Sequence, residues 1–306
     1  MNGIVIRNTG SSYVVLTSDG CEMECHVKGN FRVRGIRSTN PVAVGDKVEI
    51  QLQSDNSAWI TEIQERKNYI IRRSTNLSKQ SHIIAANLDL AALIITVNHP
   101  ITSLTFIDRF LATAEAYNVP ACLIINKIDI YSDLELQSMQ QITDLYQSIG
   151  YKVFSVSAID KKSVEFLKQM FDDKIVLLSG NSGVGKSTML NSLLGEHVTR
   201  IGEISIAHNK GMHTTTFSQM YPLNNGWIID TPGIKGFGTI DMKKTEIGHY
   251  FRDIFRLSQR CKYSDCLHID EPNCAVLSAL ENGTLPISRY ESYLSVLNDI
   301  DENKYR

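Results

Sequence analysis

One octapeptide near the middle of the chain reads Gly180-Asn181-Ser182-Gly183-Val184-Gly185-Lys186-Ser187 and matches G-x-x-x-x-G-K-[ST] at every fixed position. A strand-like run over 175–179 precedes it, and a helical pattern follows from Ser187. In such a unit, backbone N–H groups of the glycine-rich turn converge on phosphate oxygens, and the helix adds its positive N-terminus. We therefore predict that these eight residues and Thr188 bind nucleotide phosphates, with Lys186 on the β- and γ-phosphates and Ser187 on Mg²⁺.

Two short motifs that follow other strand-like runs predict which base is bound. They read Asn126-Lys127-Ile128-Asp129 and Ser157-Ala158. The Asp129 carboxylate can accept hydrogen bonds from both N1–H and N2–H of guanine, a pair of donors that adenine lacks. The Asn126 amide can reach the purine N7, and a backbone N–H of the Ser157-Ala158 pair would meet guanine O6. Beside a phosphate loop, these residues and Lys127 predict guanine specificity.

Two further motifs are expected to sense the γ-phosphate. The first ends a strand-like run and reads Asp230-Thr231-Pro232-Gly233. Its Asp230 would hold Mg²⁺ through a water molecule, and the Gly233 N–H would meet the γ-phosphate. The second is Thr214-Thr215-Thr216, in which Thr215 would complete the Mg²⁺ coordination. The alternative for Asp230 is an ordinary turn at the end of a strand.

The order of these motifs indicates a rearranged domain. GTPases usually run from the phosphate loop through the switch threonine and D-x-x-G to N-K-x-D and S-A. Here N-K-x-D and S-A come first, at 126 and 157. This is a circular permutation, which preserves a core when one surface loop is cut and nearby termini are joined. The γ-phosphate sensor is consequently followed in sequence by the C-terminal part of the chain.

Hydrophobic patterning predicts a multi-domain α/β protein with domains at 1–72, 73–240 and 241–306. The first domain contains five short β-rich runs separated by turn signals, which predicts an OB-type β-barrel, a fold that commonly binds oligonucleotides. The runs cover residues 4–7, 13–17, 22–27, 44–52 and 59–65. From about residue 82, strand-like and helical runs alternate, which predicts a parallel sheet with helices on both faces. Helical patterns at 244–259 and 287–298 then surround a cysteine-rich segment.

That segment has the spacing Cys261-x4-Cys266-x-His268-x5-Cys274. Three thiolates and one imidazole suit tetrahedral Zn²⁺, and four protein ligands leave no open catalytic position. We expect one structural zinc ion that stabilises a helical domain with a small core of its own. The alternative is three buried cysteines and a surface histidine.

Cys21 and Cys25 are expected in a strand core, with a metal pair as the alternative.

Charge is unevenly distributed along the chain. The 31 basic and 33 acidic residues give a net charge of −2, yet four basic residues accompany Phe31 in a stretch with no acidic residue before Asp46. They are Lys28, Arg32, Arg34 and Arg37. The stretch is either a solvated loop or a nucleic-acid contact.

No apolar run approaches the roughly 18 residues that cross a bilayer, and the N-terminus does not resemble a secretory signal. We therefore expect a soluble, cytoplasmic protein without membrane contact.

The combination of barrel, permuted motifs, H-T-T-T segment and cysteine spacing resembles the bacterial ribosome small subunit-dependent GTPase A family, also called RsgA or YjeQ. The resemblance covers essentially the whole chain. It implies a late-stage assembly factor that binds and hydrolyses GTP on the 30S ribosomal subunit, as a monomer. It also implies that the barrel and the zinc domain engage 16S ribosomal RNA. By position, the guanine motif, the phosphate loop and the four zinc ligands carry over from the family.

The residue after the Asp230 motif bears on the mechanism. It is Ile234, where Ras-like GTPases have a glutamine that orients the attacking water. We therefore expect slow hydrolysis by the free protein, with His213 as a candidate catalytic group or, alternatively, a plain surface histidine. Two other functions stay open: an RNA-binding module that uses GTP only as a structural ligand, and a permuted GTPase that acts on the large subunit.

Overall fold

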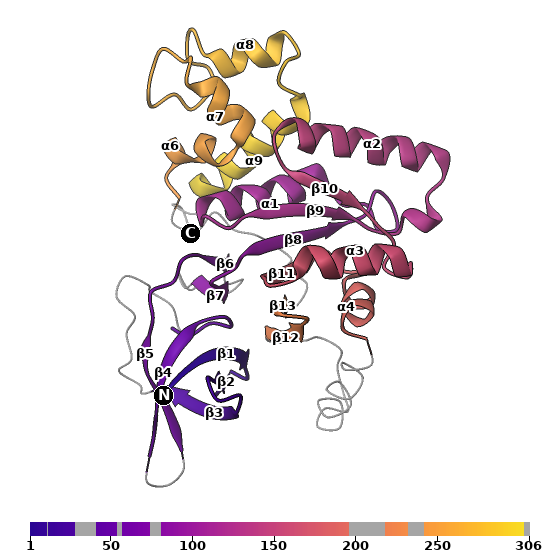
Figure 1. Cartoon of the computed structure of the whole chain (residues 1–306). Helices are drawn as coiled ribbons and strands as arrows, with labels where there is room; N and C mark the ends of the chain where they lie inside the picture. Colours follow the sequence, from indigo (N-terminus) through magenta and orange to yellow (C-terminus); the bar gives the residue numbers. More distant parts are fainter. Residues whose placement is uncertain are drawn as a thin grey trace.

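The computed structural model describes residues 1–10, 12–27, 41–53, 57–73, 81–195, 218–231 and 242–302. Within these residues, the chain forms a β-barrel, a central sheet flanked by helices, and a C-terminal group of helices (Figure 1). Arg7 of the barrel pairs with Gln219 of the central sheet. The predicted multi-domain α/β fold is confirmed, and its first two parts share one sheet of eleven described strands.

The N-terminal barrel closes through its first and fourth strands. Its strands are β1 (Asn2–Asn8), β2 (Tyr13–Thr17), β3 (Glu22–Val27), β4 (Lys47–Leu52) and β5 (Ala58–Ile63). They pair in the order β1-β2-β3-β5-β4, β4 pairs back onto β1, and only β3 and β5 are parallel. Because side chains alternate between the two faces of a strand, Val5, Val15 and Ile60 fill the core. The predicted barrel is confirmed.

The two cysteines of the barrel differ in environment. Cys25 is buried in the barrel core, and this burial raises the pKa of its thiol to about 11. Cys21 precedes β3 and is exposed. The expectation that both belong to the core is therefore right for Cys25 and wrong for Cys21.

A β-hairpin that sequence patterning missed joins the barrel to the central sheet. Its strands are β6 (Tyr69–Arg73) and β7 (Ser81–Ala86). The Ala86 N–H donates to the Val44 carbonyl at 2.9 Å. Nearby, the Arg66 guanidinium donates to both Asp46 carboxylate oxygens at 2.6 Å. Both side chains are almost fully buried, so this bidentate pair fixes the end of the barrel next to the hairpin.

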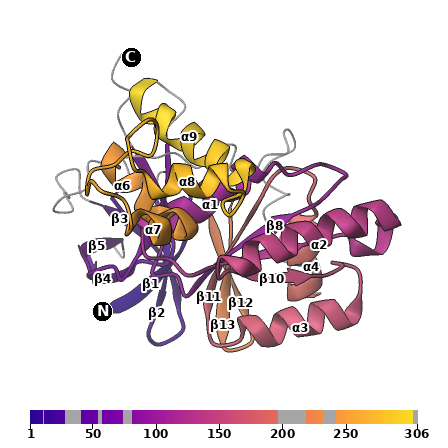
Figure 2. The ribbon, with the colours of Figure 1, turned by 90° about the horizontal axis from the view of Figure 1, so that it is seen from above.

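The central sheet carries helices on both faces, as predicted. Its strands are β8 (Leu90–Ile95), β9 (Ala121–Ile125), β10 (Lys152–Ser155), β11 (Ile175–Gly180), β12 (Gln219–Leu223) and β13 (Gly226–Asp230). They lie in the order β10-β9-β8-β11-β13-β12, with only β12 antiparallel to its neighbour β13. Helices α1 (Leu104–Ala116) and α2 (Asp133–Ser148) share one apolar core with the sheet. Helices α3 (Lys161–Phe171) and α4 (Lys186–Leu194) cover its other face (Figure 2).

The C-terminal part consists of short helices around the cysteine-rich segment. They are α6 (Lys244–Ile247), the 3₁₀ turn η2 (Gly248–Tyr250), α7 (Arg252–Ser258), α8 (Ala275–Glu281) and α9 (Ile287–Glu302). The prediction of one helix over 244–259 is wrong, because Phe251 leaves the helical conformation with φ −109° and ψ 100°. Helix α8 was not predicted. Among the described residues, no helix combines the length and apolar character that a bilayer crossing requires.

A buried ionic network fixes these helices to the central domain. The Arg289 guanidinium of α9 contacts the Asp108 carboxylate of α1 and donates to both oxygens of Asp253 in α7, at 2.8 and 2.9 Å. The Tyr146 hydroxyl of α2 donates to Asp108 at 2.7 Å. Arg289 is only 2% exposed. The network therefore connects two central helices with two C-terminal ones in a water-excluded interface.

Replacing the central cation of this network should destabilise the interface. Arg289→Leu leaves Asp108 and Asp253 without their cation, and removing one partner of a buried pair typically costs about 3–5 kcal/mol. Hydrogen exchange of the α9 amides should accelerate accordingly. Lys243→Ala is the control, because the Lys243 side chain is 79% exposed in its ion pair with Glu246. If the α9 amides of Arg289→Leu exchange as slowly as in the parent, the network contributes little to holding the C-terminal helices on the central domain.

Candidate functional site

The predicted nucleotide motifs meet at one edge of the central sheet. Gly180 ends β11, Asp230 ends β13, Asn126 follows β9, and Ser157 comes shortly after β10. The adjacent strands β8 and β11 continue into α1 and α4, which lie on opposite faces of the sheet. In open α/β sheets, ligands bind outside the carboxyl ends of the strands at such a point of divergence. The sheet topology thus creates the crevice to which the motifs contribute.

Two glycines of the phosphate loop have conformations that side chains rarely adopt. Gly183 and Gly185 have φ values of +86° and +94°. A Cβ atom on Gly185 would lie 2.4 Å from Asn126 Nδ2, and one on Gly183 would lie 3.3 Å from Pro100 Cδ. The backbone can therefore turn here, against the neighbouring loops, only because both positions lack a side chain.

Asn126 holds three of the motifs together. Its side chain is buried, Nδ2 donates to the Val184 carbonyl of the phosphate loop at 2.9 Å, and Oδ1 accepts from the Ala158 N–H at 2.9 Å. Each end of the amide is thus bonded to a different motif. The structure gives Asn126 a bracing role that the sequence did not reveal, in addition to the predicted contact with the base.

The two other residues of the guanine motif have different environments. Lys127 has a left-handed conformation, and its ammonium group donates to the carbonyls of His99 at 2.5 Å and Gly183 at 2.7 Å. It therefore connects the loop after β8 with the phosphate loop. Asp129 lies in the short 3₁₀ turn η1 (Ile128–Ile130) and is exposed. Its carboxylate is accessible for a ligand at the edge of the sheet.

Tyr131 is a supporting residue that sequence reasoning missed. Its hydroxyl donates to the Asn126 carbonyl at 2.7 Å and accepts from the Val97 N–H at 2.9 Å. It thereby bridges the chain segments that leave β8 and β9. Burial raises the pKa of Tyr131, so the hydroxyl keeps the proton that it donates. The only signal in the sequence was its position, two residues after Asp129.

Lys186 and Asp230 are in direct contact. The Lys186 ammonium group contacts the Asp230 carboxylate and donates to the Thr231 carbonyl at 2.6 Å. Ser187 and Thr188 follow in the first turn of α4 and are exposed. The predicted phosphate-binding cation, the Mg²⁺-binding hydroxyl and the acidic residue at the end of β13 are thus brought to one place.

Several predicted residues lie outside the described part of the chain. They are Lys28, Arg32, Arg34, Arg37, His213, Thr215 and Gly233. Their predicted contacts with RNA, Mg²⁺ and the γ-phosphate stay predictions.

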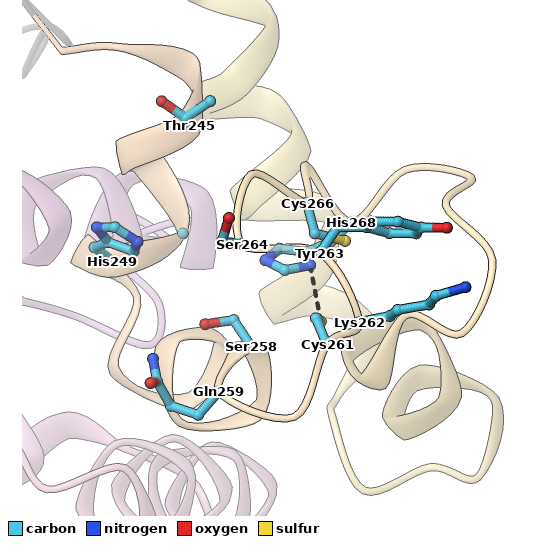
Figure 3. Close-up of a pocket in the computed structure, with 11 residues that line it drawn as sticks. Thr245, His249, Ser258, Gln259, Cys261, Lys262, Tyr263, Ser264, Cys266 and His268 are labelled. Atoms are coloured by element: carbon cyan, nitrogen blue, oxygen red, sulfur yellow. Dashed lines mark hydrogen bonds between the residues drawn. The ribbon is translucent and has the colours of Figure 1, made fainter.

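The four predicted zinc ligands converge in the C-terminal part. The sulfur atoms of Cys261, Cys266 and Cys274 and a ring nitrogen of His268 all lie within 4.8 Å of one another. His268 Nδ1 is 3.4 Å from Cys274 Sγ. It is 3.7 Å from Cys261 Sγ, the contact drawn as a dashed line in Figure 3. Tetrahedral zinc with ligand distances of roughly 2.0–2.3 Å requires ligand separations of about 3.3–3.8 Å. The two His268 distances lie in this range, and the Cys261 Sγ–Cys274 Sγ distance of 3.9 Å lies just above it. The donor set therefore fits a four-coordinate zinc ion.

Groups around the cluster hold its ligands in place. The Leu277 N–H, in the first turn of α8, donates to Cys274 Sγ at 3.5 Å. The Tyr290 hydroxyl donates to the His268 carbonyl at 2.7 Å. Burial lowers the pKa of His268, which favours the neutral imidazole that a metal requires. The cluster is thus supported by the two helices that follow it in the chain.

Comparisons with known proteins agree with this geometry. The family model described as RsgA GTPase matches residues 63–240, and the model described as RsgA N-terminal domain matches residues 2–60. The chain belongs to the RsgA GTPase family. A protein of *Phocaeicola vulgatus* named small ribosomal subunit biogenesis GTPase RsgA is 57% identical over 307 residues, covering 100% of this chain and 99% of the relative. The RsgA protein of *Porphyromonas gingivalis* (strain W83) is 53% identical with the same coverage.

Solved structures of RsgA-like proteins have the same fold. YjeQ from *Thermotoga maritima* is 31% identical with a TM-score of 0.73, and the match covers 97% of each chain. YloQ, described as a circularly permuted GTPase, is 29% identical with a TM-score of 0.73, covering 100% of this chain and 96% of YloQ. The permuted order inferred from the motifs is therefore found in a solved relative.

A methyl group at Gly185 should impair nucleotide binding by this RsgA-family chain. Gly185→Ala places Cβ against Asn126 Nδ2 and imposes a left-handed conformation that costs roughly 1–2 kcal/mol. We expect GTP affinity, measured by calorimetry, to fall at least about tenfold. Gly20→Ala is the control, because Gly20 also has a positive φ, +85°, but no atom within 4 Å of an added Cβ. Equal affinities of the two variants would contradict the bracing role of Asn126.

Removing one thiolate should release the zinc ion. Cys261→Ser replaces a soft ligand by a hydroxyl that binds zinc poorly, so elemental analysis should find well below one zinc per chain. Hydrogen exchange in α8 should accelerate, while GTP affinity stays close to parental because the central sheet has separate cores. Cys21→Ser, at an exposed cysteine outside the cluster, is the control. Full zinc occupancy in Cys261→Ser would refute the ligand set.

Proposed function

We propose that this chain is a GTPase that acts in the biogenesis of the small ribosomal subunit. The observation that carries the proposal is the convergence of phosphate, guanine and Asp230 motifs on one sheet edge, in a chain whose full-length relatives are named for this role. GTP is the substrate, GDP and phosphate are the products, and the cytoplasm is the place of action. The barrel and the helical C-terminal part would contact 16S ribosomal RNA in a complex with one copy of this chain.

In GTP hydrolysis, some residues of the chain would bind the nucleotide and others would stabilise the charge of the phosphates. Lys186 would neutralise the β- and γ-phosphates, Ser187 and Asp230 would hold Mg²⁺, and Asp129 would select guanine. When bound, Mg²⁺ stabilises the negative charge that develops on the phosphate oxygens. Lys127 and Asn126 keep the base-binding and phosphate-binding loops in register, which maintains the alignment on which phosphoryl transfer depends.

Orientation of the attacking water requires a further group. Ile234 has no hydrogen-bonding side chain, so the glutamine contribution of Ras-like enzymes is missing. We propose His213 as the residue that orients the water once the small subunit is bound. The zinc ion, held by the three cysteines and His268, would have only a structural role, because its four protein ligands complete the coordination.

Small subunits should accelerate GTP hydrolysis by this chain. A supplied catalytic group is worth about 10³–10⁵ in rate in Ras, so we expect stimulation of at least about tenfold in multiple-turnover phosphate release. Lys186→Ala should remain inactive with subunits, because it lacks the phosphate-binding cation. Separated large subunits are the partner control. Equal rates with and without small subunits would favour an RNA-binding module that uses GTP as a structural ligand.

The same assay tests His213. His213→Ala should lower the stimulated rate while GTP affinity stays nearly unchanged, as expected for a group that acts in the transition state. A parental rate at saturating small subunits would remove His213 from the mechanism.

Changing the carboxylate that selects guanine should alter nucleotide preference. Asp129→Asn replaces an acceptor by an amide, which matches the N1/C2 edge of xanthine better than that of guanine. Competition binding should therefore show a shift from GTP toward XTP. Asp133→Asn, four residues away in the first turn of α2, is the control and should keep the parental preference. Retained GTP preference in Asp129→Asn would place the base pocket elsewhere.

A further inference from the structure

A cavity of about 320 Å³ lies beside the zinc ligands, away from the nucleotide site. Its walls come from the turn η2, the end of α7 and the loop that carries Cys261 and Cys266 (Figure 3). The volume is within the roughly 300–1,000 Å³ of small-ligand sites. The nucleotide-binding and zinc-binding functions described above do not account for it.

The zinc ligand His268 directs a hydrogen-bond donor into this cavity. His268 is 3% exposed and faces Cys261 and Cys274 with Nδ1. When Nδ1 binds the metal, the proton of the neutral ring must be on Nε2. Within the described part of the chain, no group accepts a hydrogen bond from Nε2. Histidines that bind metals almost always donate this second N–H to an acceptor, so the acceptor must come from a ligand or from water.

Gly248 is the reason that Nε2 can reach the cavity. A Cβ atom on Gly248 would lie 3.4 Å from His268 Nε2, where it would cover the nitrogen. The backbone of Gly248 is helical, with φ −58° and ψ −27°, so conformation does not require glycine here. What the missing side chain provides is access to the imidazole.

The other polar groups around the cavity are donors or amphoteric groups. Thr245 and Ser264 offer hydroxyls and His249 offers an imidazole. The Lys262 ammonium group lies 5.2 Å from the centroid of the Tyr263 ring and points away from His249 and Ser258 (Figure 3). No carboxylate is among the described residues that line the cavity. This combination favours an anion with several acceptor oxygens.

We propose that this cavity binds a phosphate group of the RNA backbone, with His268 Nε2–H as its buried donor. The inference deepens the proposed action on the small ribosomal subunit and rests on it for the source of the phosphate. Phosphate contacts position a protein on nucleic acid without reading its sequence. A phosphate held here would therefore fix the orientation of the zinc-binding part, because its donor is itself a ligand of the zinc ion.

The test uses the zinc-loaded full chain and two probes, inorganic phosphate and purified small subunits. Phosphate should shift the His268 Nε2–H resonance in nitrogen-15 NMR spectra. Gly248→Ala, which covers the nitrogen without strain, should weaken phosphate binding at least about tenfold, the scale of a lost hydrogen bond to a charged group. It should also weaken sedimentation with small subunits, while zinc content and GTP affinity stay parental.

Two further variants keep the test valid if Gly248→Ala loses zinc. His249→Phe removes a donor at similar shape, and Ser264→Ala removes a hydroxyl without touching a ligand. Both should weaken phosphate binding, whereas Ser278→Ala, an exposed position on α8 outside the cavity, should not.

The outcomes separate this inference from the proposed function. Parental affinity of zinc-loaded Gly248→Ala for both probes would overturn the site. Loss of inorganic phosphate binding with unchanged subunit binding would overturn the RNA assignment and identify a site for free phosphate. If the parent binds phosphate but no small subunit, the proposed function fails and the RNA source fails with it, while the anion site remains.

Discussion

The candidate nucleotide site depends on one buried amide. Asn126 receives the Ala158 N–H and donates to the Val184 carbonyl, so three motifs that are distant in sequence are fixed by a single side chain. A buried polar group left without partners costs about 1–3 kcal/mol. The loss of either bond of the Asn126 amide is therefore costly, which favours keeping both. Gly185 must lack a side chain for the same reason, since its backbone lies against this amide. The base-binding loop and the phosphate-binding loop therefore keep their geometry only together, because the same side chain fixes both.

The circular permutation changes which parts of the chain are attached to this site. The C-terminal helices dock on α1 and α2 through Arg289, on the face of the sheet opposite α3 and α4. Helix α1 begins just after the loop whose His99 carbonyl is bound by Lys127. The part that carries the Cys261–Cys274 cluster is thus packed against elements that also border the base-binding side of the crevice.

Local chemistry could be predicted from this sequence better than long-range packing. The phosphate loop, the guanine motif and the zinc ligands were recognisable because each needs certain residue types at fixed spacing. Strand β12 was missed because Pro222 lies within it, and proline is tolerated in a strand only where no ladder hydrogen bond is needed. The register pair of β12 with β1 is at Gln219, away from Pro222. The bracing by Tyr131 and the break of the predicted 244–259 helix at Phe251 were not predictable. The Tyr131 bridge depends on Val97, whose proximity only the folded chain establishes, and no residue pattern marks the change of backbone conformation at Phe251.

The pairing of β1 with β12 has a mechanical consequence. Strand β12 lies in sequence between Thr214-Thr215-Thr216 and Asp230, the segments expected to respond to the γ-phosphate, and the barrel is hydrogen-bonded to its edge. On the far side, the C-terminal helices are held to α1 by the buried ion pair of Arg289 with Asp108. A ribosomal surface that held the barrel and these helices at once would clamp the central domain at two points. A movement of β12 relative to α1 on loss of the γ-phosphate would change the spacing of these two contacts and so couple the nucleotide state to release from the subunit.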